Sequence, residues 1–237
     1  MDRLSQTLLP TERQPPADAE ALSHKLMVRA GLIRQVGSGL WSWMPVGWKV
    51  HERAVQIVRE EIDAIGGQEM LMPVLLPAEP WKRSGRYESV GAELFRLKDR
   101  RDADLLLAMT HEEIVTMHVA QVVRSYRDLP LILYHFQTKE RDEPRPRAGV
   151  LRTREFIMKD SYTFDRDDEG LQAGYEKHIG AYERIFDRAC RPSSPRRTRR
   201  GTTPGRSGRR CGHRPGCAGR SRAAGRRRRG RRCRSPS

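Results

Sequence analysis

The sequence predicts an α+β domain over the first 190 of its 237 residues. Apolar residues recur at helical spacing over 48–65 and again over 171–186. Between these segments, residues 131–138 and 150–164 have the length and composition of strands. Consecutive strands joined by one loop pair antiparallel, so we expect an antiparallel sheet flanked by helices.

Local signals predict the remaining elements in chain order. Residues 1–17 are polar and contain three prolines, which favours an extended segment. Asp18 is placed to cap a helix that Gly31 would end. Glycines among tryptophans over 31–48 indicate a hairpin packed on a core. Prolines interrupt the apolar run over 70–81, which predicts a strand at a sheet edge.

Charge is distributed unevenly along the chain. The formal net charge is +16, but residues 191–237 hold eighteen arginines and no lysine, aspartate or glutamate. The first 190 residues carry 28 basic and 30 acidic side chains, a balance that does not indicate a general nucleic-acid surface there. Residues 191–237 contain no Val, Ile, Leu, Met, Phe, Trp or Tyr, so we expect a disordered tail.

Cysteine usage and hydropathy indicate a compartment. Cys190 is the only one of the four cysteines within the first 190 residues, so no disulfide framework is predicted and a reducing compartment fits. The N-terminus lacks a basic segment followed by an apolar run, and no window approaches about 18 consecutive apolar residues. We therefore expect a soluble, cytoplasmic protein.

The stretch 131–164 carries side chains suited to a nucleotide. Arg141 and Glu143 stand two apart and would share one face of a strand. The same period places another set on one face of the second run: Arg152, Arg154, Phe156, Met158, Asp160 and Tyr162. Arginines bind phosphate oxygens, a ring stacks on a base and a carboxylate accepts from an amino group. The alternative is a solvated, salt-bridged hairpin.

A second cluster, Thr110-His111-Glu112-Glu113, follows an apolar run that reads as a buried strand over 105–109. Thr110 would cap the next helix, and the glutamates would lie in its first turn, where the helix dipole favours them. A capped helix start therefore explains this cluster without any function. Metal binding by His111 and Glu112 would need a second ligand at i+4, which is missing, so no metal site is predicted.

The helix over 48–65 and the proline-broken strand after it indicate a subunit interface. Internal packing would leave the same pattern.

Five segments of the sequence match sequence motifs of one enzyme family. They are PADAEALSHKLMVRAGLIRQ, SGLWSWMPVG, MPVLLPAEPWKRSGR, THEE and RDEPRPRAGVLRTREFIMKDSYTF. Over residues 8–188 the chain resembles the N-terminal part of bacterial prolyl-tRNA synthetases, which are class II aminoacyl-tRNA synthetases. The last segment contains the second class II motif, an Arg-x-Glu followed by Arg-x-x-x-Phe. The resemblance implies an incomplete class II catalytic domain over residues 1–190.

The resemblance also implies an ATP site. Arg141 would hold the α-phosphate of ATP together with the carboxylate of the amino acid, and would act in catalysis. Glu143 would accept a hydrogen bond from the adenine amino group. Arg152 would contact the outer phosphates, and Phe156 would stack on the adenine ring.

For L-proline, the resemblance implies that Thr110 and Glu112 meet the secondary ammonium group, with Arg141 on the carboxylate. The implied reaction joins proline and ATP into prolyl-adenylate, then transfers the prolyl group to tRNA(Pro). Mg²⁺ would bridge the phosphates of ATP. The region over about 48–80 resembles the first class II motif and would form a homodimer interface.

Four residues before and within the second motif depart from the family pattern. Ala108-Met109 replaces a Gly-Pro pair, Glu140 replaces an aromatic residue, and Ala148 stands where phenylalanine is frequent.

Residues 191–237 show none of the family's later segments, and we expect a frameshift near Cys190 in a GC-rich gene. The product would be a truncated fragment that is inactive alone. One alternative is an RNA-binding protein that acts through its arginine-rich tail, and another is an inactive, regulatory synthetase relative. A zinc knuckle in the tail is disfavoured by the irregular spacing of its cysteines.

Overall fold

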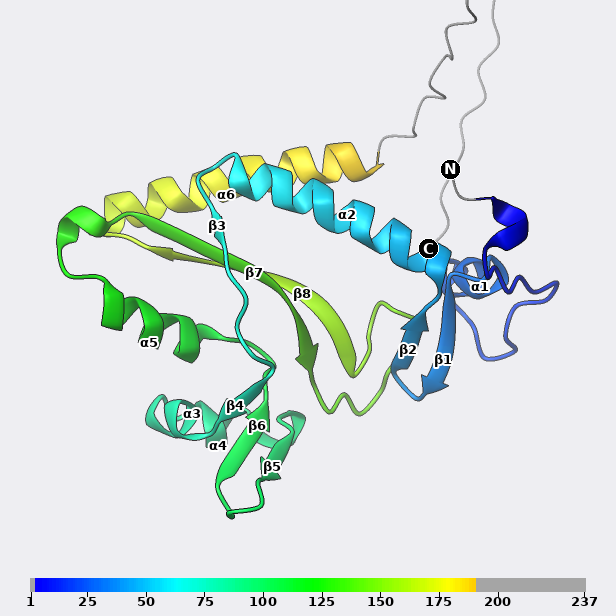
Figure 1. The fold of residues 1–237 in the computed structure, drawn as a ribbon, viewed down its shortest axis with the longest axis horizontal. Coiled ribbons are helices and arrows are strands. Elements are labelled where there is room, and N and C mark those ends of the chain that lie inside the picture. The colour runs from blue at the N-terminus through cyan, green and yellow to red at the C-terminus, as the bar shows by residue number, and fades with distance from the viewer. Residues whose placement is uncertain (1–2, 191–237) are drawn as a thin grey trace, which may run out of the picture. The chain divides into compact units, whose positions relative to one another are not determined.

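The computed structural model describes residues 3–190, and the expectations for residues 191–237 lie outside that part (Figure 1). The helices are α1 (Leu22–Arg29), α2 (Pro45–Asp63), α3 (Glu79–Arg83), α4 (Arg86–Ser89), α5 (Glu112–Val122) and α6 (Asp168–Cys190). Short 3-10 turns are η1 (Leu4–Gln6), η2 (Gly91–Glu93) and η3 (Tyr126–Asp128). The strands are β1 (Ile33–Gly37), β2 (Leu40–Trp43), β3 (Gln68–Glu69), β4 (Leu75–Pro77), β5 (Arg96–Lys98), β6 (Asp104–Leu107), β7 (Leu131–Glu140) and β8 (Glu155–Phe164).

The long hairpin β7–β8 is the central element of the described residues. It pairs antiparallel over ten residues per strand, from Leu131 opposite Phe164 to Glu140 opposite Glu155. β3 joins it through a short parallel pairing, which gives the order β3-β7-β8. The predicted antiparallel hairpin is confirmed, and the parallel strand is an addition.

Helices α2 and α6 pack against each other along one face of this hairpin (Figure 1). Their shared core consists of buried apolar side chains at helical spacing, Ile57 and Ile62 on α2 with Ala181 and Ile185 on α6. The fully buried ring of Tyr134 on β7 completes this core. The helical periods of the sequence therefore place both helices correctly.

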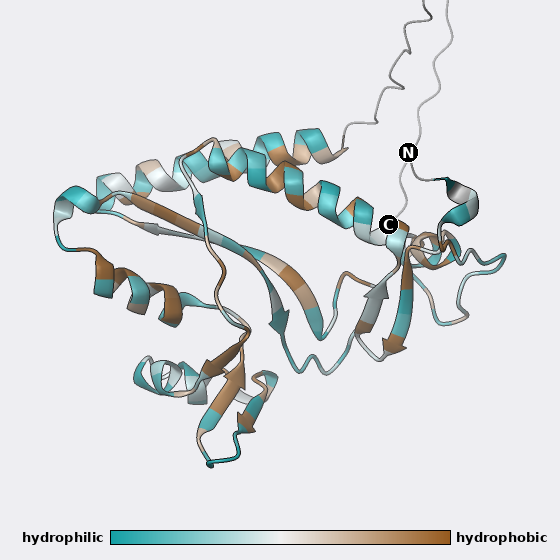
Figure 2. Cartoon of the chain, in the orientation of Figure 1, coloured by the Kyte–Doolittle hydropathy of each residue, from teal (hydrophilic) through white to brown (hydrophobic). Residues whose placement is uncertain are grey.

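A second sheet, with the order β4-β6-β5, carries the other core. Its largest fully buried side chain is Trp81 on α3, which packs with Leu76 on β4, Leu106 on β6 and Val115 on α5. Figure 2 shows the apolar residues gathered on β4, β6 and α5. Both β3 and β4 are edge strands, as the prolines between and within them predict.

One exposed stripe of α6 is apolar. Five side chains on it are between 40 and 67% exposed: Leu171, Tyr175, Ile179, Tyr182 and Phe186. No helix within residues 3–190 combines the length and hydropathy needed to cross a membrane.

Two predicted details are wrong. β7 ends at Glu140 and β8 begins at Glu155, so the strand does not begin at residue 150. The loop between them contains two prolines, which cannot donate to a ladder, and Ala148 and Gly149 have positive φ values of 59° and 66°. Helix α1 begins after Ala21 without a side-chain cap, so Asp18 does not cap it.

Candidate active site

The loop between β7 and β8 carries most of the predicted nucleotide-binding residues. The loop runs from the end of β7 at Glu140 to the start of β8 at Glu155. Arg141, Glu143 and Arg152 therefore do not lie on strands, and the alternation of side chains along a strand does not orient them. Hydrogen bonds hold the base of the loop instead. The amide of Arg141 donates to the carbonyl of Arg154 at 2.8 Å, and the amide of Arg147 donates to that of Arg152 at 3.0 Å.

The β1–β2 hairpin supports this loop from outside. The amide of Arg154 donates to the carbonyl of Gly39 at 2.9 Å. A Cβ atom at Gly39 would lie 2.8 Å from Cγ of Pro146, so only glycine permits this approach.

Arg141 carries a buried side-chain donor that is unpartnered in the described part of the chain. Its Nε is buried and has no hydrogen-bond partner within residues 3–190. Its Cζ lies 5.3 Å from the centroid of the Phe156 ring. Two residues predicted to bind ATP are therefore brought together, and the unpaired donor suits an anionic ligand.

Glu143 and Arg152 are also brought together, but as partners of each other. Nε of Arg152 donates to Oε2 of Glu143 at 2.7 Å, and this bond lowers the pKa of the carboxyl. Nε of Arg154 donates to the backbone carbonyl of Glu143 at 3.1 Å. The side chains of Glu143 and Arg152 line a cavity of about 530 Å³ in the loop, together with Arg145 and Arg147. A nucleotide that used Glu143 and Arg152 separately would have to open this ion pair.

Thr110 does not cap α5, contrary to the prediction. The helix begins at Glu112, and its N-cap residue His111 makes no side-chain cap. Oγ1 of Thr110 instead accepts from Nη2 of Arg86 at 2.8 Å. Nη1 of the same arginine donates to Oε2 of Glu112 at 2.9 Å. Thr110 and Glu112 thus face a common cationic partner, which a simple capped helix start does not require.

A buried ionic cluster lies between α5 and the β7–β8 hairpin. Nζ of Lys139 is 2.5 Å from Oδ2 of Asp160 and 3.2 Å from Nε2 of His135, and it also contacts Nδ1 of His111. The hydroxyl of Tyr162 donates to Oδ2 of Asp160 at 3.0 Å. The side chains of Lys139 and His135 are fully buried. This cluster couples the strand that precedes Arg141 to the residue between Thr110 and Glu112.

The charges of the cluster follow from burial and hydrogen bonding. Burial lowers the pKa of Lys139, and it lowers the pKa of His111 to about 4. For Asp160, burial opposes ionisation, but hydrogen bonds from His135 and Lys139 outweigh it and lower the pKa. The ammonium group of Lys139 and the carboxylate of Asp160 therefore form the central ion pair of the cluster.

Three ligand atoms of this cluster, from His111, His135 and Asp160, lie within 4.8 Å of one another. Their arrangement suits a metal ion, but the ammonium group of Lys139 contacts all three residues. A divalent ion would have to displace that buried cation.

The sequence predictions missed Lys139, His135 and Arg86. Two of them left a signal, because His135 and Lys139 stand four positions apart and therefore lie on the same face of the strand. Arg86 left none. Its partners are 24 to 27 residues away in the chain.

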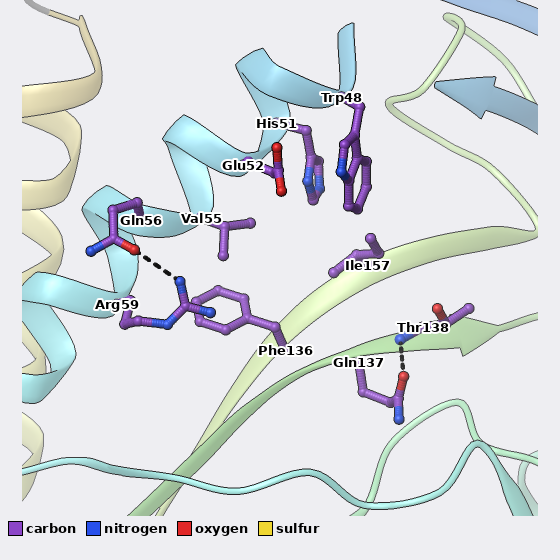
Figure 3. Close-up of a pocket in the computed structure, with 10 residues that line it drawn as sticks. All are labelled: Trp48, His51, Glu52, Val55, Gln56, Arg59, Phe136, Gln137, Thr138 and Ile157. Carbon is purple, nitrogen blue, oxygen red and sulfur yellow. Dashed lines mark hydrogen bonds between the residues drawn. The ribbon is translucent and has the colours of Figure 1, made fainter. Parts of the chain in front are cut away.

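A separate cavity of about 370 Å³ lies between α2 and the β7–β8 hairpin, and no predicted site residue lines it (Figure 3). The rings of His51 and Trp48 stack with centroids 5.0 Å apart, and Cζ of Arg59 lies 5.1 Å from the centroid of the Phe136 ring. One wall of this cavity is α2, the helix that the sequence predicts to lie in a subunit interface.

Comparisons with known proteins decide the family. Residues 95–204 match the model of the tRNA synthetase class II core domain (G, H, P, S and T). The chain is 56% identical over 188 residues to proline–tRNA ligase 1 of Streptomyces avermitilis, and 57% identical over 188 residues to the proline–tRNA ligase of Streptomyces coelicolor. The chain belongs to the prolyl-tRNA synthetase family. In both cases the match covers 79% of this chain and 33% of the relative, so the chain spans about a third of their length.

Solved structures of prolyl-tRNA synthetases share the fold. One is the Giardia lamblia enzyme in complex with prolyl-adenylate, with a TM-score of 0.64 and 23% identity over 69% of this chain and 34% of that one. Another is the Cryptosporidium parvum enzyme complexed with L-proline and AMP, with a TM-score of 0.63 and 19% identity over 74% of this chain and 36% of that one. At this identity the likeness concerns the fold alone, and it confirms a class II core.

Glu140 is the family departure with a measurable consequence. It lies opposite Glu155 in the β7–β8 register. Burial, together with the neighbouring charge of Glu155, raises the pKa of Glu140 to about 7. Unfolded Glu140 loses its proton in the ordinary glutamate range, so the folded state binds more protons between that range and pH 7. The contribution of Glu140 to stability is therefore full at acidic pH and is lost as the pH rises through about 7.

We predict that Glu140→Gln raises the free energy of unfolding relative to the wild type, and that this gain is larger at pH 8 than at pH 5. Removing the like-charge repulsion should yield on the order of 1 kcal/mol, a figure reduced for the partial solvent exposure of the pair. Urea unfolding at both pH values measures this difference. Glu155→Gln is the matched variant and should show the same trend, whereas an equal effect of Glu140→Gln at both pH values would contradict the pairing.

Proposed function

We propose that residues 1–190 form the part of a proline–tRNA ligase that binds L-proline and ATP and activates proline as prolyl-adenylate. The prolyl group would then pass to tRNA(Pro). The observation that carries this proposal is the side chain of Arg141 beside the ring of Phe156. Its buried Nε has no hydrogen-bond partner among the residues that the structure describes. The relatives named as proline–tRNA ligases support the same substrates.

In this proposal the residues of the site bind and orient the substrates and stabilise charge, and none forms a covalent bond with them. Arg141 would neutralise the α-phosphate while the carboxylate of proline attacks phosphorus and pyrophosphate leaves. Phe156 would stack on the adenine, and Glu143 and Arg152 would exchange their mutual ion pair for contacts with adenine and outer phosphates. Mg²⁺ would arrive with ATP as the counter-ion of its phosphates.

Proline would bind through its secondary ammonium group to Thr110 and Glu112. The pKa of Glu112 is lowered, because hydrogen bonds from Thr110 and Arg86 outweigh the burial that would raise it. An ionised carboxylate in a partly buried site rejects analogues that lack the cation, because it would then remain unpaired.

A chimaera tests the proposed activity. Residues 1–190 would replace the matching N-terminal third of the Streptomyces coelicolor ligase, to which they are 57% identical. We expect proline-dependent ATP–pyrophosphate exchange in this chimaera. Glu112→Gln should raise the KM for proline by about tenfold or more, since it removes one charge-assisted contact. A folded chimaera without exchange would contradict the proposal.

The proposal includes a cytoplasmic homodimer formed through about residues 48–80. Four apolar side chains of this region are between 40 and 74% exposed: Trp48, Val50, Leu71 and Leu75. A surface of this kind is typical of subunit contacts. Sedimentation of the chain over a range of concentrations measures the association, and a monomer throughout would contradict the interface.

A further inference from the structure

Arg86 stands at the centre of the cluster that contains Thr110 and Glu112. It opens α4, directly after Gly85. Its Nη2 donates to Oγ1 of Thr110 at 2.8 Å, while Nη1 donates to Oε2 of Glu112 at 2.9 Å and to Oε1 of Glu113 at 3.1 Å. One planar guanidinium group therefore bridges a hydroxyl and two carboxylates.

Neighbouring side chains also hold Arg86 in place. Its Cζ lies 4.6 Å from the centroid of the Trp81 ring, and Trp81 is fully buried. The side chain of Glu113 is only 6% exposed, and its Oε1 also accepts from Oγ of Ser84 at 2.9 Å. A guanidinium held by a buried ring and a buried carboxylate cannot swing away when a ligand arrives.

The two glutamates therefore have different roles. Glu113 is buried and serves as the counter-ion of Arg86, whereas the side chain of Glu112 is 51% exposed and can meet a ligand. Two carboxylates and one guanidinium leave one net negative charge. That charge matches a ligand with a single cationic group.

We propose that Arg86 is a positioning residue of the amino-acid site, which holds Thr110 and Glu112 side by side and neutralises Glu113. The inference rests on the proposed function, because it takes Thr110 and Glu112 as the residues that meet the secondary ammonium group of proline. Arg86 itself contacts no substrate in this proposal.

The charged and titratable groups around Glu112 come from five elements. Arg86 approaches from α4 and Glu113 from α5 itself. Lys139 on β7 and Tyr162 on β8 interact with Glu112 electrostatically. Arg83, at the end of α3, lines the same cavity of about 740 Å³ as Glu112. Its side chain makes no hydrogen bond or ion pair within residues 3–190. Arg86 alone among the cations combines charge with a direct hydrogen bond to Glu112.

The pH titration of Glu112 in the full 237-residue chain tests the bridge without any ligand. NMR of chain labelled at the glutamate carboxyl carbons would follow Glu112 in the wild type, in Arg86→Met and in Arg83→Met. We expect Arg86→Met to move the titration to higher pH, since the hydrogen bond and charge that oppose the effect of burial are lost. Arg83→Met removes the same charge from the same cavity and should cause a smaller shift. Equal shifts in the two variants would overturn the proposal.

Binding of L-proline to the same chains is the second readout. Arg86→Met should weaken binding by about tenfold or more, and Arg86→Lys should restore it only in part, because an ammonium group keeps the charge but not the planar fork. Full restoration by lysine, or unchanged binding in Arg86→Met, would overturn the positioning role. A wild-type chain that binds no proline would contradict the proposed function, while a shifted Glu112 titration would still support the bridge. If Arg86→Met fails to fold, Arg86→Lys and Arg86→Gln provide the same comparison.

Discussion

Asp160→Ala is expected to destabilise the protein by about 3–5 kcal/mol, because it leaves the ammonium group of Lys139 buried without its carboxylate. Lys139 is fully buried, and its Nζ lies 2.5 Å from Oδ2 of Asp160. Urea unfolding at pH 7 measures the loss. The loss should shrink as the pH rises towards 10, because the folded variant will hold Lys139 uncharged while the unfolded chain still binds the proton.

Two controls isolate this effect. Asp102→Asn removes the charge of a carboxylate whose ion pair with Lys98 is exposed, and it should change stability by less than about 1 kcal/mol. The double variant Lys139→Met with Asp160→Leu replaces the pair by apolar side chains of similar volume and should recover most of the stability. A loss below about 1 kcal/mol in Asp160→Ala would show that the pair is not buried as described.

Arg141→Ala in the chimaera with the Streptomyces coelicolor ligase is expected to lower proline-dependent ATP–pyrophosphate exchange by about 30-fold to 1,000-fold. This range corresponds to about 2–4 kcal/mol, typical of a charge-assisted phosphate contact in the transition state. Nε of Arg141 motivates the prediction, because within residues 3–190 it has no hydrogen bond that a phosphate would need to replace. kcat should fall together with kcat/KM, because the contact strengthens as charge develops.

Arg124→Ala is the matched control, because Arg124 is exposed and its only hydrogen bond recorded within residues 3–190 comes from its backbone amide. It should leave exchange within about twofold of the parent chimaera. An unchanged exchange rate in Arg141→Ala, with normal folding, would refute the role assigned to Arg141.

Local pattern predicted the helices and the central hairpin well. Helical spacing located α2 and α6, whose apolar faces meet in one core, and the two strand-like runs correspond to β7 and β8. The same patterns failed where backbone geometry changes. The alternating pattern predicts that Arg141 and Arg152 lie on strands. Positive φ values at Ala148 and Gly149 and two prolines prevent strand pairing there.

The sequence by itself determined the family, because the wording around Arg141 and Thr110 is specific, and it determined the chemistry that those residue types can perform. Only the tertiary structure decided how the site is held. The contacts of Arg86 with Glu112 and of Lys139 with His111 join residues 26 and 28 positions apart. Periodicity reports which face of an element is buried, but the burial of a charge depends on a partner brought from another element, and folding alone supplies that partner.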